Sequence, residues 1–264
     1  ERTSTKVKPS PFIWVSKADK KFPHVYRTDR RWGNTINKYG VRCVKLKVPA
    51  TDVCAWFDAE RKRRFVYIVQ PAPENKVLIY DGTDATLLKE IPVRDPRSLV
   101  LDKAEPGSRL HVLHKNKEGA GVVTALMLAK GTFSGKWERT LTLAGETAML
   151  DFDVDGKGVV YLVPAGKNEI LTIEPKTGKR AAFGKPPAPG KFDKLALHNP
   201  DRVAVWKDKD GKERVLVIER GGPGRISEWT PKGEFLLQWF LAHTAAYGYC
   251  LDPEEPTHLY HVAN

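Results

Sequence analysis

The chain has 264 residues, with 44 lysines and arginines against 32 aspartates and glutamates, and so carries a formal net charge of +12. With 41% hydrophobic and 29% charged residues, the composition excludes wholesale disorder. No apolar run approaches the roughly 18 to 20 residues of a membrane-spanning helix, and three cysteines are too few for a disulfide framework. Because the chain begins at Glu1 with no signal segment, we expect a processed product or an excised fragment.

Short strands with alternating apolar and polar residues recur along the chain, separated by turns rich in Gly, Pro, Asn and Asp. After an N-terminal extension at residues 1–10, the repeating units are 11–48, 52–93, 97–143, 148–183, 202–240 and 246–264. Each of the four central units holds four expected strands in about 40 residues, which is typical of a β-propeller blade. We therefore predict an all-β propeller of four-stranded antiparallel blades, forming a single domain over residues 11–264.

The two terminal units are incomplete. Residues 11–48 supply three strands and lack a first strand, whereas residues 246–264 supply only a first and a second. Either the two ends share one blade, which gives a five-bladed ring without exposed sheet edges, or the parent molecule has six blades of which two are cut. We favour six, because the chain stops just after an expected strand.

Two stretches carry a resemblance to known propellers. The sequence DFDVDGKGVVYLVPAGKNEILTIEPKTGK (151–179) resembles NHL-type and related six-bladed propellers. The segments 225–240 and 246–264 are similar to propeller segments of large bacterial cell-surface proteins. The resemblance implies the fold, but such propellers include scaffolds, RNA binders, lyases and hydrolases, so it selects no activity. The stretch KDKDGKE (207–213) departs from the NHL pattern, which weakens any transfer of a ligand.

One motif resembles a metal-binding site. Asp151, Asp153, Asp155 and Gly156 read D-x-D-x-D-G, the opening of a calcium-binding EF-hand loop. The twelfth position of that loop should be a bidentate Glu, and here it is Leu162. We favour the alternative that the spacing reflects strand alternation, with the third Asp and the Gly forming the turn into the next strand.

The histidines form no zinc motif. His111 and His114, like His258 and His261, are three residues apart, a spacing that points two side chains to opposite faces of a strand. No G-x-S-x-G, H-E-x-x-H or Walker loop is present either. We therefore expect no cofactor and no metal, and name no catalytic residue.

The cysteines stand in apolar, strand-like contexts, where a cysteine behaves as a small buried hydrophobe; a disulfide or a reactive thiol is the alternative. Cys43 belongs to an expected outermost strand and Cys54 to the innermost strand of the next blade. Three strand spacings of about 4.8 Å exceed the roughly 7 Å Cα limit of a disulfide, so we predict that these two are not bonded.

Basic clusters are the most informative chemical feature. One fills the expected turn between the first and second strands of unit 52–93, and the other fills a turn between the third and fourth strands of the preceding unit. Both turn types emerge on the same face of a propeller, so we expect one basic rim, composed of Arg27, Arg30, Arg31, Trp32, Arg61, Lys62, Arg63 and Arg64. Arginine forks match phosphate, sulfate and carboxylate groups. The alternative is a solvated rim without a ligand, in which Asp29, Asp58 and Glu60 relieve the repulsion between the positive charges.

These observations favour a non-enzymatic binding or scaffold module, secreted or at a cell surface, that recognises an anionic polymer or other protein domains. Acidic polysaccharide is preferred to RNA as the polymer. One alternative is a polysaccharide lyase or hydrolase using loops of the opposite face, where Lys20, Lys21, Arg94, Arg97, Lys115, Arg220 and His243 could gather. The second alternative is NHL-type RNA binding, which would show a steep salt dependence.

Overall fold

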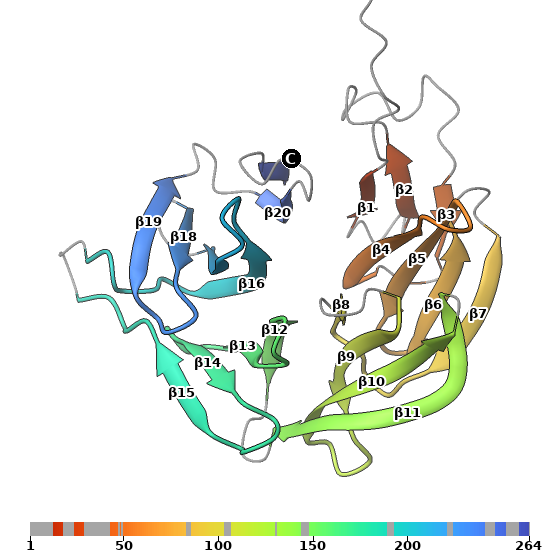
Figure 1. Ribbon diagram of the computed structural model, residues 1–264, viewed down its shortest axis with the longest axis horizontal. Coiled ribbons are helices and arrows are strands. Elements are labelled where there is room, and N and C mark those ends of the chain that lie inside the picture. Colours follow the sequence, from red (N-terminus) through yellow and green to blue (C-terminus); the bar gives the residue numbers. More distant parts are fainter. Residues whose placement is uncertain are drawn as a thin grey trace, which may run out of the picture. The chain divides into compact units, whose positions relative to one another are not determined.

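The computed structural model describes residues 13–17, 24–28, 43–46, 48, 50–82, 86–102, 107–129, 131–143, 148–188, 193–220, 224–240, 246–251 and 259–263. The chain divides into two compact units, Glu1–Leu143 and Ala144–Asn264 (Figure 1). Over the described ranges the regular structure is entirely β-strand, and no helix capable of crossing a membrane occurs there.

The first unit contains two complete four-stranded antiparallel sheets and one three-stranded sheet, each joined in sequence order. The complete sheets are β4 (Asp52–Asp58), β5 (Arg63–Gln70), β6 (Lys76–Asp81) and β7 (Leu87–Pro92), followed by β8 (Ser98–Leu101), β9 (Arg109–Lys115), β10 (Gly121–Ala129) and β11 (Thr132–Leu143). The three-stranded sheet is β1 (Ile13–Lys17), β2 (His24–Thr28) and β3 (Cys43–Lys45).

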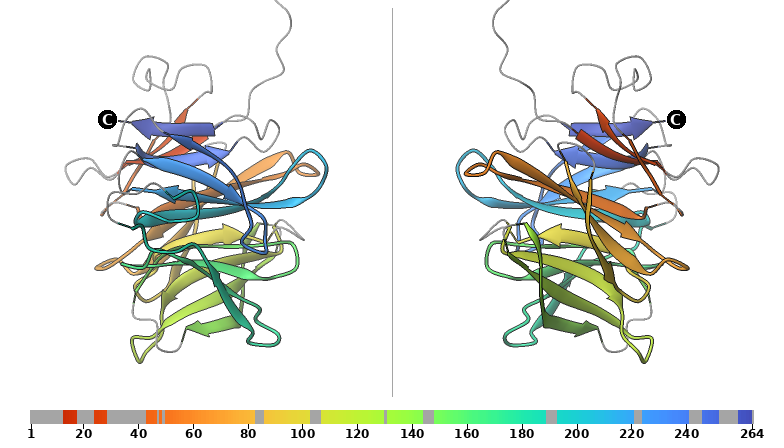
Figure 2. Two further views of the ribbon diagram at one scale, coloured as in Figure 1. Left: turned by 90° about the vertical axis from the view of Figure 1, so that its left-hand side faces the viewer. Right: turned by 90° about the vertical axis from the view of Figure 1, so that its right-hand side faces the viewer.

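The second unit repeats this plan with two complete sheets and a two-stranded one. The complete sheets are β12 (Met149–Val154), β13 (Val160–Pro164), β14 (Ile170–Ile173) and β15 (Arg180–Phe183), then β16 (Pro200–Lys207), β17 (Glu213–Glu219), β18 (Arg225–Trp229) and β19 (Phe235–Phe240). The two-stranded sheet is β20 (Ala246–Leu251) and β21 (Leu259–Ala263). Figure 2 shows the strands as twisted antiparallel sheets. The predicted fold, an all-β propeller with four-stranded antiparallel blades, is confirmed.

Side chains of the second strand in each complete blade point alternately to its two faces, and those on one face form the core between neighbouring blades. In the first unit, Phe65 and Tyr67 of β5 pack with Leu110 and Leu126 of the next blade, and all four are at most 1% exposed. Burial of such side chains is worth about 1.5–3 kcal/mol each. The Tyr67 hydroxyl donates a 2.9 Å hydrogen bond to the Gly131 carbonyl, so one side chain joins two blades through both apolar and polar contacts.

Glycine at the next blade's turn makes this close packing possible. Gly131 has φ +80°, and a Cβ placed on it would lie 2.3 Å from the Phe65 ring. In the second unit, a Cβ on Gly233 (φ +82°) would lie 2.4 Å from Phe183. Both turns therefore require glycine for the backbone conformation and for the close approach of a phenylalanine side chain.

The acidic residues of β12 join two blades of the second unit. Asp151 Oδ2 accepts a 3.0 Å hydrogen bond from the Val203 N–H, and Asp153 Oδ2 accepts one of 2.6 Å from the Val205 N–H. Asp155 lies just beyond the strand and accepts two backbone N–H groups of its own turn. The turn interpretation of the D-x-D-x-D-G motif is confirmed, and the first two carboxylates have a further role in linking neighbouring innermost strands.

The first unit has a similar link. Asp52 on β4 accepts hydrogen bonds from the Ser98 hydroxyl (2.6 Å) and the Leu99 N–H (2.9 Å) of β8. In both units, carboxylates on the innermost strand of one blade thus accept hydrogen bonds from backbone N–H groups on the innermost strand of the next blade.

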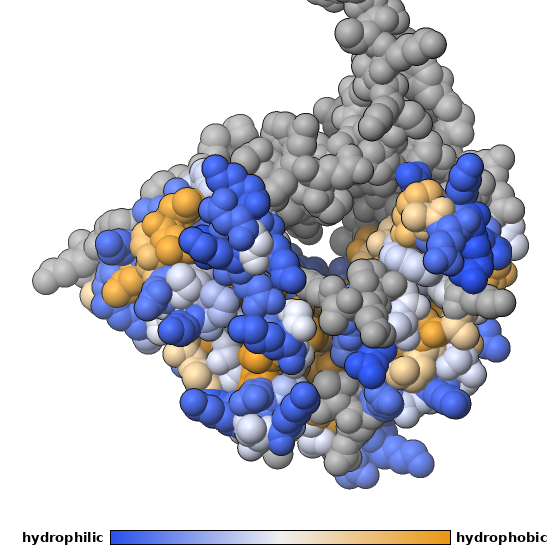
Figure 3. Space-filling view, viewed as in Figure 1, coloured by the Kyte–Doolittle hydropathy of each residue, from blue (hydrophilic) through white to orange (hydrophobic). Residues whose placement is uncertain are grey.

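Exposed apolar side chains concentrate on one outermost strand. Leu236, Leu237 and Trp239, all on β19, are among the large hydrophobic residues that remain exposed, and Figure 3 shows an apolar patch over this strand.

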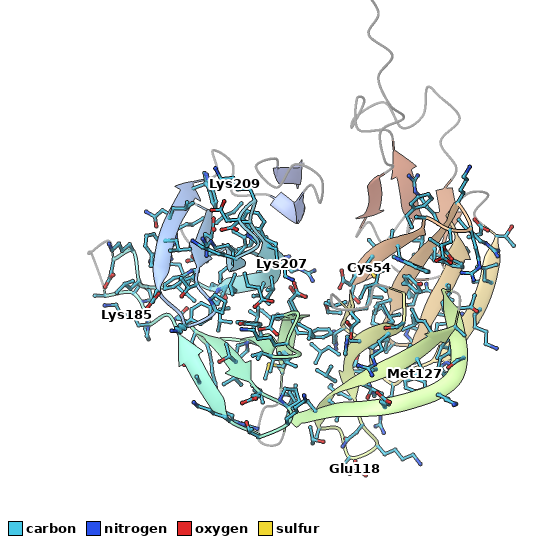
Figure 4. All side chains as sticks on the ribbon, viewed as in Figure 1. Cys54, Glu118, Met127, Lys185, Lys207 and Lys209 are labelled. Atoms are coloured by element: carbon cyan, nitrogen blue, oxygen red, sulfur yellow. The ribbon has the colours of Figure 1, made fainter. Side chains whose placement is uncertain are left out.

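Cys54 lies on β4, packed against the core of the first unit (Figure 4). Its thiol is not part of a disulfide. The prediction that Cys43 and Cys54 are not bonded is therefore confirmed; the side chains of Cys43 and Cys250 lie outside the described part.

Candidate anion-binding site

The β4–β5 hairpin carries the cluster of basic residues on which the prediction of an anion site rests. Its turn spans residues 59–62, and Arg63 and Arg64 belong to β5, where they pair in register with Asp58 and Phe57. The prediction that the whole cluster fills the turn was wrong, because cross-strand contacts extend β5 toward the turn. Arg27 likewise lies on strand β2, not in a turn.

Arg61 is held by a buried carboxylate at the end of β4. Its Nη1 lies 2.5 Å from Asp58 Oδ2, and its backbone N–H donates a 3.1 Å hydrogen bond to the other oxygen of the same carboxylate. The side-chain hydrogen bond from Arg61 lowers the pKa of Asp58. The carboxylate therefore stays ionised and fixes the orientation of the guanidinium.

Arg63 is fixed in a comparable way from the opposite side of the hairpin. Its Nε donates a 2.7 Å hydrogen bond to Asp81 Oδ2 on β6, and its Cζ lies 5.3 Å from the centre of the Phe65 ring. Asp81 is buried, so the pair combines charge, a hydrogen bond and a cation–π contact.

Arg64 lies over an exposed aromatic ring. Its Cζ is 5.4 Å from the centre of Phe57, the cross-strand neighbour, and Phe57 is 49% exposed. Burial lowers the pKa of the Arg64 guanidinium, which remains charged at neutral pH. The pair forms an apolar and cationic surface at the end of the hairpin.

The two carboxylates orient the guanidinium groups without covering them. The Arg61 and Arg63 side chains remain 45% and 44% exposed. Each uses a single guanidinium nitrogen in its ion pair with the carboxylate. Besides Asp58 and Glu60, which the sequence already placed beside the cluster, the structure adds Asp81 of β6 as a further carboxylate that lowers the local excess of positive charge. Arg30, Arg31 and Trp32 lie outside the described residues, so the joint rim remains a prediction.

The opposite-face loops contain a second cationic cluster. Two of the seven predicted residues meet at one carboxylate: Arg97 Nη2 and Lys115 Nζ lie 3.0 and 2.9 Å from Asp95 oxygens. A third, Arg94, precedes Asp95 in the chain and donates to the Lys117 carbonyl. Burial opposes ionisation of Asp95, but the hydrogen bonds from Lys115 and Arg97 outweigh it and lower its pKa.

The remaining members of that predicted set lie in the second unit or outside the described residues. Arg220 belongs to the second unit, where its Nε lies 2.8 Å from Asp201 Oδ2. Lys20, Lys21 and His243 lie outside the described residues.

A repeated loop anchor was missed in the sequence. Asp95 (φ +44°) donates its backbone N–H to the Asn75 side chain at 2.9 Å, and Asn199 (φ +52°) does the same to Asn168 at 3.1 Å. Both residues precede a proline and the innermost strand of a blade. The available signal was an Asp-Pro or Asn-Pro dipeptide at the same place in two repeats. Apart from glycine, Asn and Asp are the residues that best tolerate a positive φ.

A buried ion pair was also missed. Glu219 Oε1 accepts a 2.7 Å hydrogen bond from Arg225 Nε, and both side chains are at most 3% exposed. Arg225 also donates to the Gln238 side chain at 3.0 Å and to the Ala196 carbonyl. Fully partnered and buried, this arginine orders the loop before β16 and is not available to a ligand.

Comparisons with known proteins address the fold. No family model and no curated protein matches the sequence. Among solved structures, streptogramin B lyase is similar at 12% identity and a TM-score of 0.51, over 96% of this chain and 87% of that one. U3-55K is 12% identical with a TM-score of 0.55, over 92% of this chain and 63% of its own. Hydrazine synthase of Kuenenia stuttgartiensis is 17% identical with a TM-score of 0.53, over 99% and 76%.

Identities this low show the fold alone. A lyase and a synthase are among the similar structures, so the shared fold does not select an activity. What the comparisons establish is that the chain is similar to known β-propellers.

Proposed function

We propose that the protein is a non-enzymatic β-propeller binding module, and that the β4–β5 hairpin recognises an anionic polymer, with acidic polysaccharide preferred to RNA. The observation that carries the proposal is that buried Asp58 and Asp81 hold Arg61 and Arg63 in place while leaving both arginine side chains about half exposed. An arginine already fixed by a carboxylate loses less rotamer freedom on binding a ligand.

The hairpin suits a ligand with repeated anionic groups. Two guanidinium forks offer planar N–H donors to sulfate, phosphate or carboxylate. Arg61 presents its fork from the turn and Arg63 presents its fork from the start of β5. A single contact of one fork with one anionic group contributes little binding free energy. Several such contacts along one polymer would raise the overall affinity.

The test is elution from immobilised heparin and from immobilised single-stranded RNA. Replacing both arginines by glutamine (Arg61→Gln, Arg63→Gln) removes the charges but leaves an amide donor near each carboxylate. Replacing both by lysine keeps the charge and removes the fork. Lys89→Gln with Lys136→Gln, at two exposed lysines of the same unit, is the matched control for net charge.

We expect the glutamine pair to elute at clearly lower salt than the control, and the lysine pair to fall between. Equal shifts for the glutamine pair and the control would reject a localised site. Tighter retention on RNA than on heparin, lost in the glutamine pair, would keep the site and identify RNA as the polymer.

A lyase is the second candidate, because Arg94, Arg97 and Lys115 lie close together and could neutralise a uronate carboxylate. A lyase also needs a base, and Asp95, the carboxylate in this cluster, is stabilised as an ion by two cations and is therefore weakly basic. We therefore prefer the binding module. Appearance of the ultraviolet absorbance of unsaturated uronate in a digest of acidic polysaccharide, lost in Lys115→Gln, would favour the lyase instead.

A further inference from the structure

Phe57 is an exposed aromatic residue near the tip of the β4–β5 hairpin. It lies on β4, the innermost strand of its blade, and is 49% exposed. Arg64, its cross-strand neighbour on β5, places its Cζ atom 5.4 Å from the centre of the ring. The backbone of Arg64 is fixed as well, because its carbonyl accepts a 2.8 Å hydrogen bond from the Gly82 N–H just after β6. The hairpin therefore presents an aromatic ring to solvent beside a half-buried arginine.

The two faces of the hairpin carry different groups. Strand alternation places Arg63 on one face, whereas Phe57 and Arg64 lie on the other. Val66, on the same face as Arg64, packs with Leu46, which follows β3. The face that carries Phe57 is therefore directed toward the N-terminal part of the first unit, where β1 lies beside β4 (Figure 1).

Most of the net positive charge of the protein belongs to that N-terminal part. Residues 1–48 contain 13 lysines and arginines against 3 aspartates and glutamates, residues 49–143 contain 15 against 12, and residues 144–264 contain 16 against 17. The hairpin itself is close to balanced, because Asp58, Glu60 and Asp81 accompany its four cations. The charge of the segment that contains β1–β3 therefore attracts an anionic ligand to the side on which Phe57 is exposed.

We propose that the Phe57 ring is a stacking subsite of the anion-binding hairpin, so that its ligand is a polymer whose anionic groups are borne on sugar rings. The inference rests on the proposed function. Arginine forks bind sulfate, phosphate and carboxylate alike, so they do not distinguish an acidic polysaccharide from polyphosphate. An aromatic ring does, because the C–H groups of a sugar pack against its electron-rich face, whereas polyphosphate has no apolar surface to offer.

The position of the exposed aromatic residues favours a sugar over a nucleic-acid base. Proteins that hold single-stranded nucleic acid stack successive bases on several aromatic side chains. Among the described residues of the first unit, the other exposed aromatic side chain is Trp137, on outermost strand β11 of the next blade. Because Phe57 lies on an innermost strand, the two are separated by the width of a sheet and form no continuous row of stacking platforms.

The test compares three labelled probes by fluorescence anisotropy: a heparin oligosaccharide, a polyphosphate and an oligouridylate, each with the same number of negative charges. Phe57→Leu removes the ring but keeps an apolar side chain. Trp137→Leu is the matched control, because it makes the same kind of change at a side chain that is 42% exposed in the same unit. The pair Arg61→Gln and Arg63→Gln removes both forks. Circular dichroism establishes that each variant is folded.

We expect Phe57→Leu to lower the ratio of heparin affinity to polyphosphate affinity by at least about threefold, because only the sugar polymer loses a stacking contact. Trp137→Leu should leave this ratio within about twofold of the parent. The arginine pair should weaken the binding of heparin and polyphosphate together, because both polymers use the guanidinium forks.

Three outcomes would overturn the inference alone, provided that the arginine pair weakens both polymers: an unchanged ratio in Phe57→Leu, an equal fall of the ratio in Trp137→Leu, or a larger loss for oligouridylate than for heparin in Phe57→Leu. The last of these would assign the ring to a base. If the arginine pair weakens neither heparin nor polyphosphate, the proposed function fails, and this inference fails with it.

Discussion

Adding a methyl group to Gly131 should destabilise the first unit through two separable effects. A Cβ there would lie 2.3 Å from the Phe65 ring, and the residue has φ +80°. The positive φ costs a non-glycine residue about 1–2 kcal/mol. Forcing an extra carbon into a packed core costs a further 1–3 kcal/mol or so. We therefore expect Gly131→Ala to lower the free energy of unfolding by about 2–5 kcal/mol.

Gly135 provides the matched control. It belongs to the same hairpin and has φ +89°, but nothing lies within 4 Å of its would-be Cβ. Gly135→Ala should therefore cost only the backbone term of about 1–2 kcal/mol. Urea unfolding followed by near-ultraviolet circular dichroism gives both values. If Gly131→Ala destabilises the protein no more than Gly135→Ala does, the close packing of Phe65 on this turn is wrong.

A double variant separates crowding from loss of the Tyr67 hydrogen bond. Shrinking the ring in Phe65→Leu should relieve the clash, so the combined cost of Phe65→Leu and Gly131→Ala should fall below the sum of the two single costs. If the two costs are additive, the destabilisation by Gly131→Ala comes from the backbone conformation or from the hydrogen bond between Tyr67 and the Gly131 carbonyl.

Two further predictions concern carboxylates. Asp95→Asn removes the charge but keeps a residue type that tolerates the positive φ, as Asn199 shows. Because the folded pKa of Asp95 lies below its ordinary value of 3.8, we expect the variant to be less stable than the parent at neutral pH. The two stabilities should converge as pH falls through the folded pKa, as measured by urea unfolding at a series of pH values. Stability curves that stay parallel to pH 2 or so would contradict that linkage. Asp153→Leu removes the carboxylate that accepts the hydrogen bond from the buried Val205 N–H. We expect the free energy of unfolding to fall by about 1–3 kcal/mol and amide exchange at Val205 to be faster than in the parent. Unchanged exchange there would refute the link between β12 and β16.

The sequence by itself predicted the architecture. A strand–turn rhythm with four strands in about 40 residues identified the blades, and alternation within a strand identified which side chains share a face. The turn role of Asp155 followed from the same local logic, because a turn closes between residues that are neighbours in the chain. The four complete sheets span residues 52–92, 98–143, 149–183 and 200–240.

Only the tertiary structure decided what the polar residues do. Asp153 and Val205 are 52 positions apart and Arg63 and Asp81 are 18 apart, and neither partner can be read from the neighbouring sequence. Alternation predicts the face on which a carboxylate lies, but its partner depends on how blades and strands pack. In the sequence, Asp58 and Glu60 were already neighbours of the basic cluster, but only the structure shows that Asp58 orients Arg61 and that Asp81, on another strand, orients Arg63.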